Sequence, residues 1–186
     1  MSSLEADFAE LLARLRDPQP RGSDPFYYFV YPPEQALTVK EQIPVWTARL
    51  RNLGITVERI SFADLLWQVI DASGHWPTWL EFEDGADQRE VNESVRDVLR
   101  NRNALVDLLV PLLATGRPNT VVFLTEVETL HPYFRVRGLE SALHDRIAVP
   151  TVIFYPGGRA GQFGLRFLGF YPEDGNYRAT LIGGLP

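Results

Sequence analysis

Apolar residues recur at helical spacing at the start of the chain. They occupy one face of a helix at Leu4, Phe8, Leu11, Leu12 and Leu15. Ser2 and Glu5 have the spacing of a capping box, and the pattern ends at Pro18. The sequence predicts an amphipathic helix and a linker over residues 1–20, and this helix could be an appendage to a single α/β domain over residues 21–186.

Four later runs predict strands, and their aromatic and β-branched residues are typical of buried strands. The runs are Phe26–Tyr31, Ile55–Phe62, Thr120–Leu124 and Pro150–Tyr155. Helical stripes separate them over Val39–Leu50, Phe62–Ile70 and about residues 133–145, and Pro44 is expected to kink or restart the first. Alternating strands and helices predict a three-layer α/β sandwich with a mostly parallel, Rossmann-like sheet.

The middle of the chain is predicted to be helical and acidic. Residues 75–79 (His-Trp-Pro-Thr-Trp) suggest a turn anchored by aromatic side chains. Six acids follow, at Glu81, Glu83, Asp84, Asp87, Glu90 and Glu93. An apolar stripe from Val91 to Leu113 then predicts one long helix with an acidic entry, which favours its dipole, and the acids are interpreted as a solvated face.

Glycine is concentrated near the C-terminus, which indicates turns and short strands in place of helices. Eight of the 14 glycines fall between Gly157 and Gly184. The segment 157–164 could approach a phosphate, but no helix N-terminus is predicted behind it, so we interpret it as a connecting loop. Residues 165–171 and 178–182 are predicted to be short strands that form an antiparallel C-terminal edge of the sheet.

Composition excludes several classes of protein. The 186 residues contain no cysteine, which removes disulfides, zinc–thiolate sites, iron–sulfur clusters and thiol nucleophiles. The net charge of −6 is the wrong sign for a nucleic-acid binder, so direct contact with nucleic acid is not expected. No signal peptide and no apolar run long enough for a bilayer are present, which predicts a cytoplasmic protein that does not enter the membrane.

Polar residues that directly follow a predicted strand are the candidates for chemistry. Glu126, Glu128 and His131 follow the Thr120–Leu124 run, at the end where open α/β sheets bind ligands. They could bind a divalent metal or share acid–base work in a metal- or nucleotide-dependent enzyme. The alternative is that they cap and solvate the next loop. No complete catalytic motif is present in the sequence, and we expect no cofactor.

Five arginines form a second set of candidate site residues, for binding an anion or DNA. Arg135, Arg137, Arg159, Arg166 and Arg178 could form an anion-binding cluster if the strand ends converge. Four of them, without Arg166, would also be the contacts of a DNA-binding accessory subunit. The alternative is that these arginines are dispersed over the surface.

The C-terminal half resembles the BrxB family of bacteriophage-exclusion (BREX) defence systems. Residues 123–125 and 131–135, followed by Leu139 and Leu143, resemble the family segment "T-G-V-G … P-x-x-R-x-H … L". Residues 150–157 are similar to its "P-x-V-x-F-Y-P-G" segment, and residues 165–169 and 176–179 to its closing block "L-x-L-F-G … N-Y-Y-R-A". The resemblance is specific over about residues 119–182. A looser likeness covers residues 26–34.

The chain departs from the family pattern at three positions. Glu126 and Glu128 stand where the pattern tends to have glycine, and Arg137 stands where it tends to have histidine. A permanent cation at that position cannot act as a general base at neutral pH. Any chemical task of that histidine is therefore in doubt here.

The resemblance implies a non-enzymatic adaptor of a complex that blocks phage replication. Its implied partners are other BREX components, above all a PglZ-like protein of the alkaline-phosphatase fold, and a homo-oligomer is a further alternative. Aromatic and arginine residues are enriched at interfaces. We therefore expect partner contacts at Tyr133, Phe134, Arg135, Arg137, Tyr155, Arg159, Tyr177 and Arg178. The alternative for Phe134 and Tyr155 is that they belong to the core. The N-terminal amphipathic helix is the competing docking element.

Overall fold

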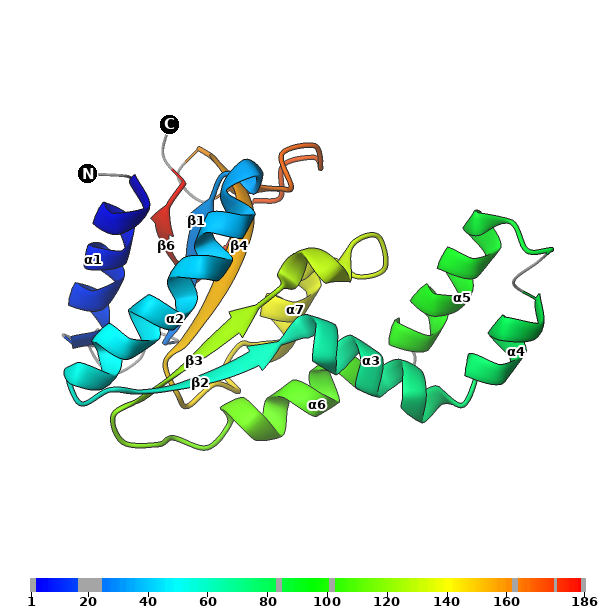
Figure 1. Ribbon diagram of the computed structural model, residues 1–186, viewed down its shortest axis with the longest axis horizontal. Helices are drawn as coiled ribbons and strands as arrows, with labels where there is room; N and C mark the ends of the chain where they lie inside the picture. The colour runs from blue at the N-terminus through cyan, green and yellow to red at the C-terminus, as the bar shows by residue number, and fades with distance from the viewer. Residues whose placement is uncertain are drawn as a thin grey trace.

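A parallel sheet forms the centre of the computed structural model, which describes residues 3–16, 25–82, 85–100, 103–161, 164–175 and 177–184. The described strands follow the order β2-β3-β4-β1-β6, and β5 pairs with β4 alone. Their bounds are β1 Phe26–Tyr31, β2 Thr56–Ser61, β3 Thr120–Thr125, β4 Thr151–Ala160, β5 Gly164–Phe167 and β6 Thr180–Gly183. Figure 1 shows this sheet, and the predicted α/β sandwich with its mostly parallel sheet is confirmed.

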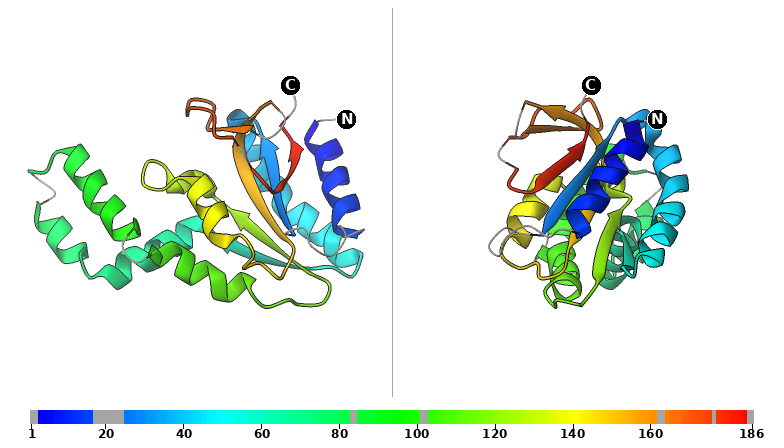
Figure 2. Two further views of the ribbon diagram at one scale, coloured as in Figure 1. Left: turned by 180° about the vertical axis from the view of Figure 1, so that it is seen from behind. Right: turned by 90° about the vertical axis from the view of Figure 1, so that its left-hand side faces the viewer.

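Helices cover both faces of the sheet. Their bounds are α1 Ser3–Arg16, α2 Ala36–Asn52, α3 Phe62–Ser73, α4 Trp76–Phe82, α5 Gln88–Arg100, α6 Ala104–Leu113 and α7 Val136–Leu143, with short 3₁₀ turns η1 Pro33–Gln35 and η3 Val127–Leu130. Alternate residues of β1 enter the two cores: Phe29 packs under α1 and α2, while Tyr28 packs under α3, α6 and α7. Figure 2 shows α1 and α2 together on one side. In the described part of the chain, no helix is both long and apolar enough to cross a membrane.

The N-terminal helix is packed into the core. Phe8 of α1 is fully buried and stacks on Trp46 of α2, with ring centroids 4.8 Å apart. Arg49 donates to Glu5 at 2.5 Å and lies over the Phe8 ring. The apolar face of α1 is therefore covered by this chain itself. The predicted cap at Ser2 and the predicted linker after the helix lie outside the described residues.

Helices α2 and α3 begin and continue for local reasons. Ser61 Oγ accepts a hydrogen bond from the Asp64 backbone N–H at 3.2 Å and so caps the start of α3. Pro44 does not restart α2, which continues through it from residue 36 to residue 52. The buried stripe of this helix, which includes Ile43 and Trp46, holds it against the sheet on both sides of the proline.

Two predictions for the middle of the chain are wrong. Residues 76–82 form helix α4 instead of an aromatic turn, and Pro77 is tolerated in its first turn because the backbone N–H there has no intrahelical partner. The long acidic helix is divided into α5 and α6, and Asn103 has a left-handed backbone with φ 55° between them. Asparagine tolerates this conformation, which interrupts a helix. The acids Glu83 and Asp84 lie outside the described residues.

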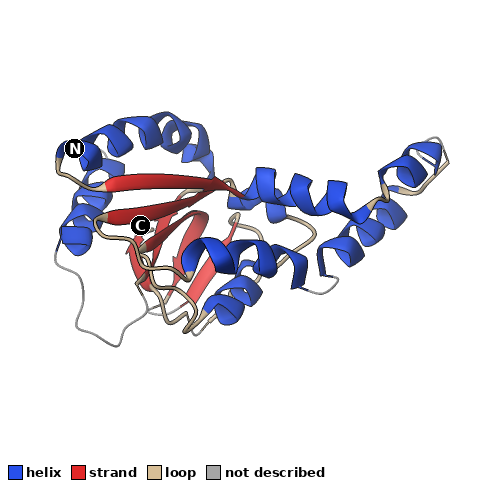
Figure 3. Ribbon diagram, turned by 90° about the horizontal axis from the view of Figure 1, so that it is seen from below, coloured by secondary structure: helices blue, strands red, loops and turns tan. Residues whose placement is uncertain are grey.

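The division of that helix produces an arm, which consists of the end of α3 from Trp67 onward together with α4 and α5. Helices α4 and α5 project away from the sheet beyond the end of α3, as Figures 1 and 3 show. A separate small core joins α5 to α3, formed by Leu66, Val69, Ile70, Val95 and Leu99. The arm is therefore an extension of the domain with its own apolar seam.

The C-terminal edge is antiparallel only in part. β5 pairs antiparallel with the end of β4, and a Cβ added to Gly157 would lie 2.3 Å from the Arg166 carbonyl oxygen, so glycine permits this close pairing. Residues 157–160, predicted as a loop, belong to β4. β6 is parallel to β1, with Tyr27 beside Thr180, because the chain first returns to the start of the sheet with Tyr177 buried on its way. The antiparallel prediction is wrong for this strand.

Candidate functional site

Glu126 joins two strand ends at the carboxyl edge of the sheet, where open α/β sheets bind ligands. It directly follows β3 and has a left-handed backbone with φ 63°. Ser61 Oγ, at the end of β2, donates to its Oε2 at 2.5 Å, and Arg59 Nη2 lies 3.4 Å from the same oxygen. The carboxylate therefore bridges the ends of β2 and β3.

Lys40 contacts the same loop from helix α2. Its Nζ lies 3.0 Å from Glu128 Oε1 and 3.8 Å from Glu126 Oε1, so one ammonium group partly neutralises both carboxylates. The other oxygen of Glu128, Oε2, is buried and has no hydrogen-bond partner among the described residues. Sequence reasoning did not place Lys40 in this site, since no motif relates residues so far apart along the chain.

His131 belongs to a different group of side chains. Its Nδ1 is within hydrogen-bond distance of the Tyr171 hydroxyl, and the Arg135 guanidinium lies 4.5 Å from the centre of the Tyr171 ring. In the described residues no three His, Asp or Glu side chains are grouped to hold a metal ion. Glu126 and Glu128 meet at Lys40, and His131 does not complete the three-ligand centre of the enzyme alternative.

The five candidate arginines lie in two places. Arg137 and Arg178 line one hollow of about 360 Å³ together with Glu140, Ser141 and His144. Arg135 and Arg137 line an adjoining hollow with Asp174, whose Oδ1 is 3.9 Å from Arg137 Nη1. We call the exposed residues Arg135, Arg137 and Arg178 the arginine face.

Arg159 and Arg166 lie apart from the arginine face, in a hollow of about 630 Å³ beside the ends of β1 and β4. Arg159 donates from Nε to the Gly183 carbonyl and from Nη2 to the Leu181 carbonyl, both at 2.7 Å. Arg166 donates to Glu173 at 2.5 Å. The first arginine holds β6 in place, and the second is engaged in an exposed ion pair. The five arginines therefore do not form one cluster.

The aromatic candidates are mostly internal. Tyr155 and Tyr177 are 1% and 5% exposed, and both rings belong to the core under α7. Phe134 is partly buried against the same core, and the Tyr133 hydroxyl donates to Asn92 Oδ1 at 3.4 Å. The predicted partner contacts at Tyr155 and Tyr177 are therefore corrected, because the rings of both residues are buried in this core.

Burial controls the ionisation of these tyrosines. It raises the pKa of Tyr177 to about 12, and burial is also the main cause that raises the pKa of Tyr28, Tyr31 and Tyr155. Nearby carboxylates add to the effect, from Glu140 on Tyr28 and from Glu128 on Tyr31.

An alkaline titration checks this burial. A phenol whose pKa is raised in the folded state stabilises the fold below its unfolded pKa of about 10, and this contribution is lost as the pH rises above that value. We expect Tyr28, Tyr31, Tyr155 and Tyr177 to ionise together with cooperative alkaline unfolding, measured by tyrosinate absorbance and circular dichroism. Ionisation of all four near pH 10 in a chain that stays folded would contradict the assignment of these residues to the core.

Glu140 of α7 holds the backbone of the segment that carries Arg178, a role that the sequence did not predict. Its Oε2 accepts from the Tyr28 hydroxyl at 3.2 Å. Its Oε1 accepts from the backbone N–H groups of Arg178 at 2.9 Å and Ala179 at 3.2 Å. One carboxylate on α7 therefore fixes the segment that carries Arg178. No spacing in the sequence signals a contact between residues 28 and 140.

Comparisons with known proteins agree with the resemblance found in the sequence. Residues 58–182 match the family model described as BREX protein BrxB. A curated relative from Bacillus cereus (strain H3081.97), named BREX protein BrxB, is 26% identical over 159 residues, which cover 83% of this chain and 81% of the relative. No solved structure matches the chain.

Proposed function

The chain belongs to the BrxB family, and from this premise we propose that it is a non-enzymatic adaptor of a BREX anti-phage complex. Membership of the family implies a component of such a system. The adaptor role means that the chain positions other components by binding them. The proposed partner is a PglZ-like protein, as the resemblance implies.

The observation that carries this proposal is the arginine face. Arg137 and Arg178 are exposed side by side at one hollow, and Arg135 lies next to Arg137 at the adjoining one. Guanidinium groups form paired hydrogen bonds with carboxylates, and arginine is enriched among residues that dominate interfaces. The face therefore suits an acidic patch of a partner protein, and it stands out in a chain whose net charge is −6.

The polar groups at the strand ends support a binding role. Glu126 and Glu128 share Lys40, and Glu126 also accepts from Ser61. Arg159 is engaged with the carbonyl groups of β6. These contacts connect loops and strands of the chain itself. These side chains are engaged in structural contacts, which favours a binding role over a catalytic one.

Copurification with the BREX proteins encoded beside this chain tests the proposal. We expect the tagged chain to capture the PglZ-like protein, and the double variant Arg137→Glu, Arg178→Glu to reduce the apparent affinity more than tenfold. Hydrogen bonds to charged groups are worth about 1.5–3 kcal/mol each, and two reversed charges also repel an acidic patch.

The matched control is Arg16→Glu with Arg51→Glu, which makes the same change in charge at exposed positions of α1 and α2. This control should capture the partner as the parent does. Capture of no BREX protein by the parent in mild salt would refute the adaptor role. Equal loss in both double variants would show that only net charge matters and would refute the assignment to the arginine face.

A further inference from the structure

Large apolar side chains are exposed on the arm. Trp67, Trp76, Leu80 and Phe82 are 50%, 43%, 54% and 65% exposed. Three of the four tryptophans of the chain lie on the arm, and the fourth, Trp46, is fully buried in the core. Gathered apolar residues on a projecting element are typical of an interaction site.

The tryptophans form a continuous series of ring contacts. The rings of Trp67 and Trp76 are 5.6 Å apart, and those of Trp76 and Trp79 are 6.4 Å apart. Trp79 Nε1 donates to Ser94 Oγ of α5 at 2.8 Å. This bond fixes α4 against α5, so the aromatic surface extends from the end of α3 into the space between the two helices.

A groove of about 400 Å³ lies between α4 and α5. Trp79, Phe82 and Val91 supply its apolar lining. Glu81 and Glu90 also line it, and no lysine or arginine is present among the described lining residues. The groove therefore combines an apolar floor with negative charge.

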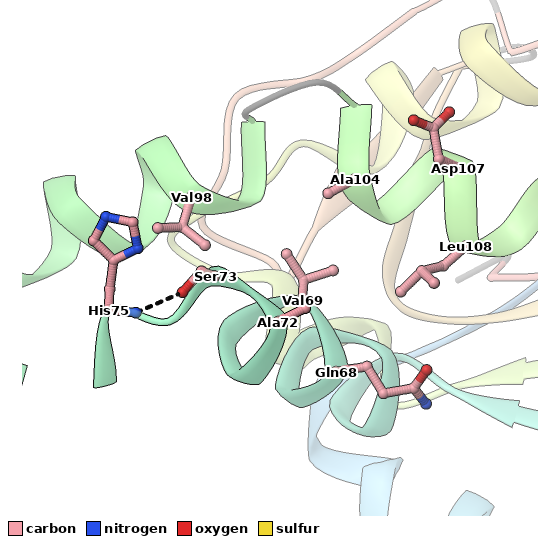
Figure 4. Close-up of a pocket in the computed structure, with 9 residues that line it drawn as sticks. All are labelled: Gln68, Val69, Ala72, Ser73, His75, Val98, Ala104, Asp107 and Leu108. Carbon is pink, nitrogen blue, oxygen red and sulfur yellow. Dashed lines mark hydrogen bonds between the residues drawn. The ribbon is translucent and has the colours of Figure 1, made fainter. Parts of the chain in front are cut away.

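The base of the arm does not use these exposed residues. A second hollow of about 460 Å³ lies there between α3, α5 and α6, and Figure 4 shows Val69, Val98 and Leu108 around it. The seam between α3 and α5 is formed by other buried residues, including Val95 and Leu99. Packing of the arm onto the domain therefore leaves Leu80 and Phe82 exposed.

We propose that the groove between α4 and α5 binds a basic amphipathic helix of another protein in the defence system. Apolar residues of that helix would lie against Trp79 and Phe82, and its lysine or arginine residues would face Glu81 and Glu90. Two copies of this chain would not pair groove to groove, because two acidic grooves repel each other. The inference rests on the proposed function for the source of the partner, but it concerns a surface separate from the arginine face.

Such an adaptor has two docking surfaces of opposite charge. The arginine face lies at the start of α7 and at Arg178. The acidic groove lies between α4 and α5, the helices that project from the sheet in Figure 1. Each surface would select a partner of complementary charge. The two could be occupied at the same time.

An array of overlapping peptides from the BREX proteins encoded beside this chain tests the inference. We expect the full-length chain to bind peptides that combine positive charge with apolar residues at helical spacing. In solution, the best of these peptides should shift the tryptophan emission to the blue, since Trp79 lines the groove and the Trp76 ring contacts that of Trp79. The double variant Glu81→Lys, Glu90→Lys and the single variant Phe82→Ser should each weaken binding at least tenfold.

Leu37→Ser is the matched control, because Leu37 is 76% exposed on α2, away from the arm. It should bind like the parent, and circular dichroism shows whether each variant is folded. Binding unchanged in folded arm variants, or a preference for acidic peptides, would overturn the inference. A concentration-dependent dimer abolished by Phe82→Ser would assign the groove to a second copy and would also overturn it. In either case capture through the arginine face would survive, so the two proposals can fail separately.

Discussion

Replacing Phe8 with alanine is expected to lower the free energy of unfolding by about 3–5 kcal/mol, the usual loss for a buried phenylalanine. The Phe8 ring is fully buried and stacks on Trp46, which in turn contacts Phe29 and Phe154. A cavity at this position would therefore separate α1 from the aromatic centre of one core. Urea denaturation followed by circular dichroism measures the change.

The control for this prediction is Leu37→Ala. Leu37 is 76% exposed, and exposed substitutions usually change stability by less than about 0.5 kcal/mol. A loss below about 1 kcal/mol for Phe8→Ala would contradict the structure, because this value is far below the cost of a cavity. It would favour the alternative in which α1 is an appendage whose apolar face awaits a partner.

Replacing Glu140 with alanine is the second change with a large expected effect. The substitution removes the acceptor of the Tyr28 hydroxyl, which is fully buried, and of two backbone N–H groups. A buried donor left without a partner costs about 1–3 kcal/mol, so the free energy of unfolding should fall by at least this amount. The segment that holds Arg178 also loses its anchor, and partner capture should weaken with it.

Glu140→Gln separates the two roles of this side chain. Glutamine keeps one acceptor oxygen, so it should retain more stability than alanine in the same urea denaturation experiment. Glu34→Ala, on an exposed position of η1, controls for loss of a carboxylate in general. Equal stabilities for the parent and Glu140→Ala would show that Tyr28 and the residue 178–179 backbone do not depend on this contact.

The sheet was predictable because its strands carry their signal locally. The continuous apolar residues of β1, β3 and β4 specify strands buried on both faces, and the alternation with helices specifies parallel pairing. The direction of β6 was not predictable. It depends on how residues 177–179 are held before the strand, by burial of Tyr177 and by the contact of Glu140 with residues 178 and 179.

The arm illustrates a different reason for failure. The apolar stripe of α5 continues into α6 at the same helical spacing, so periodicity alone predicts one helix. The interruption depends on the left-handed backbone of Asn103. Most asparagine residues do not adopt this conformation, so the residue type alone does not predict it. The projection of α4 and α5, and hence the groove between them, could not be derived from local patterns.

The candidate site was predictable in residue type but only partly in arrangement. The sequence grouped five arginines near the strand ends, and the structure places Arg135, Arg137 and Arg178 together. Arg159 is instead bonded to the carbonyl groups of β6. Contacts such as Lys40 with Glu128 join residues that no motif relates, since they are brought together only by the packing of α2 against the sheet.

The affinity of the purified chain for the purified PglZ-like protein, measured by calorimetry at two salt concentrations, tests the adaptor role most directly. We expect a saturable complex that weakens with salt, is more than tenfold weaker for Arg137→Glu with Arg178→Glu, and is unchanged for Arg16→Glu with Arg51→Glu. No heat of binding for the parent at low salt, or equal affinities for the parent and the Arg137→Glu, Arg178→Glu variant, would contradict it.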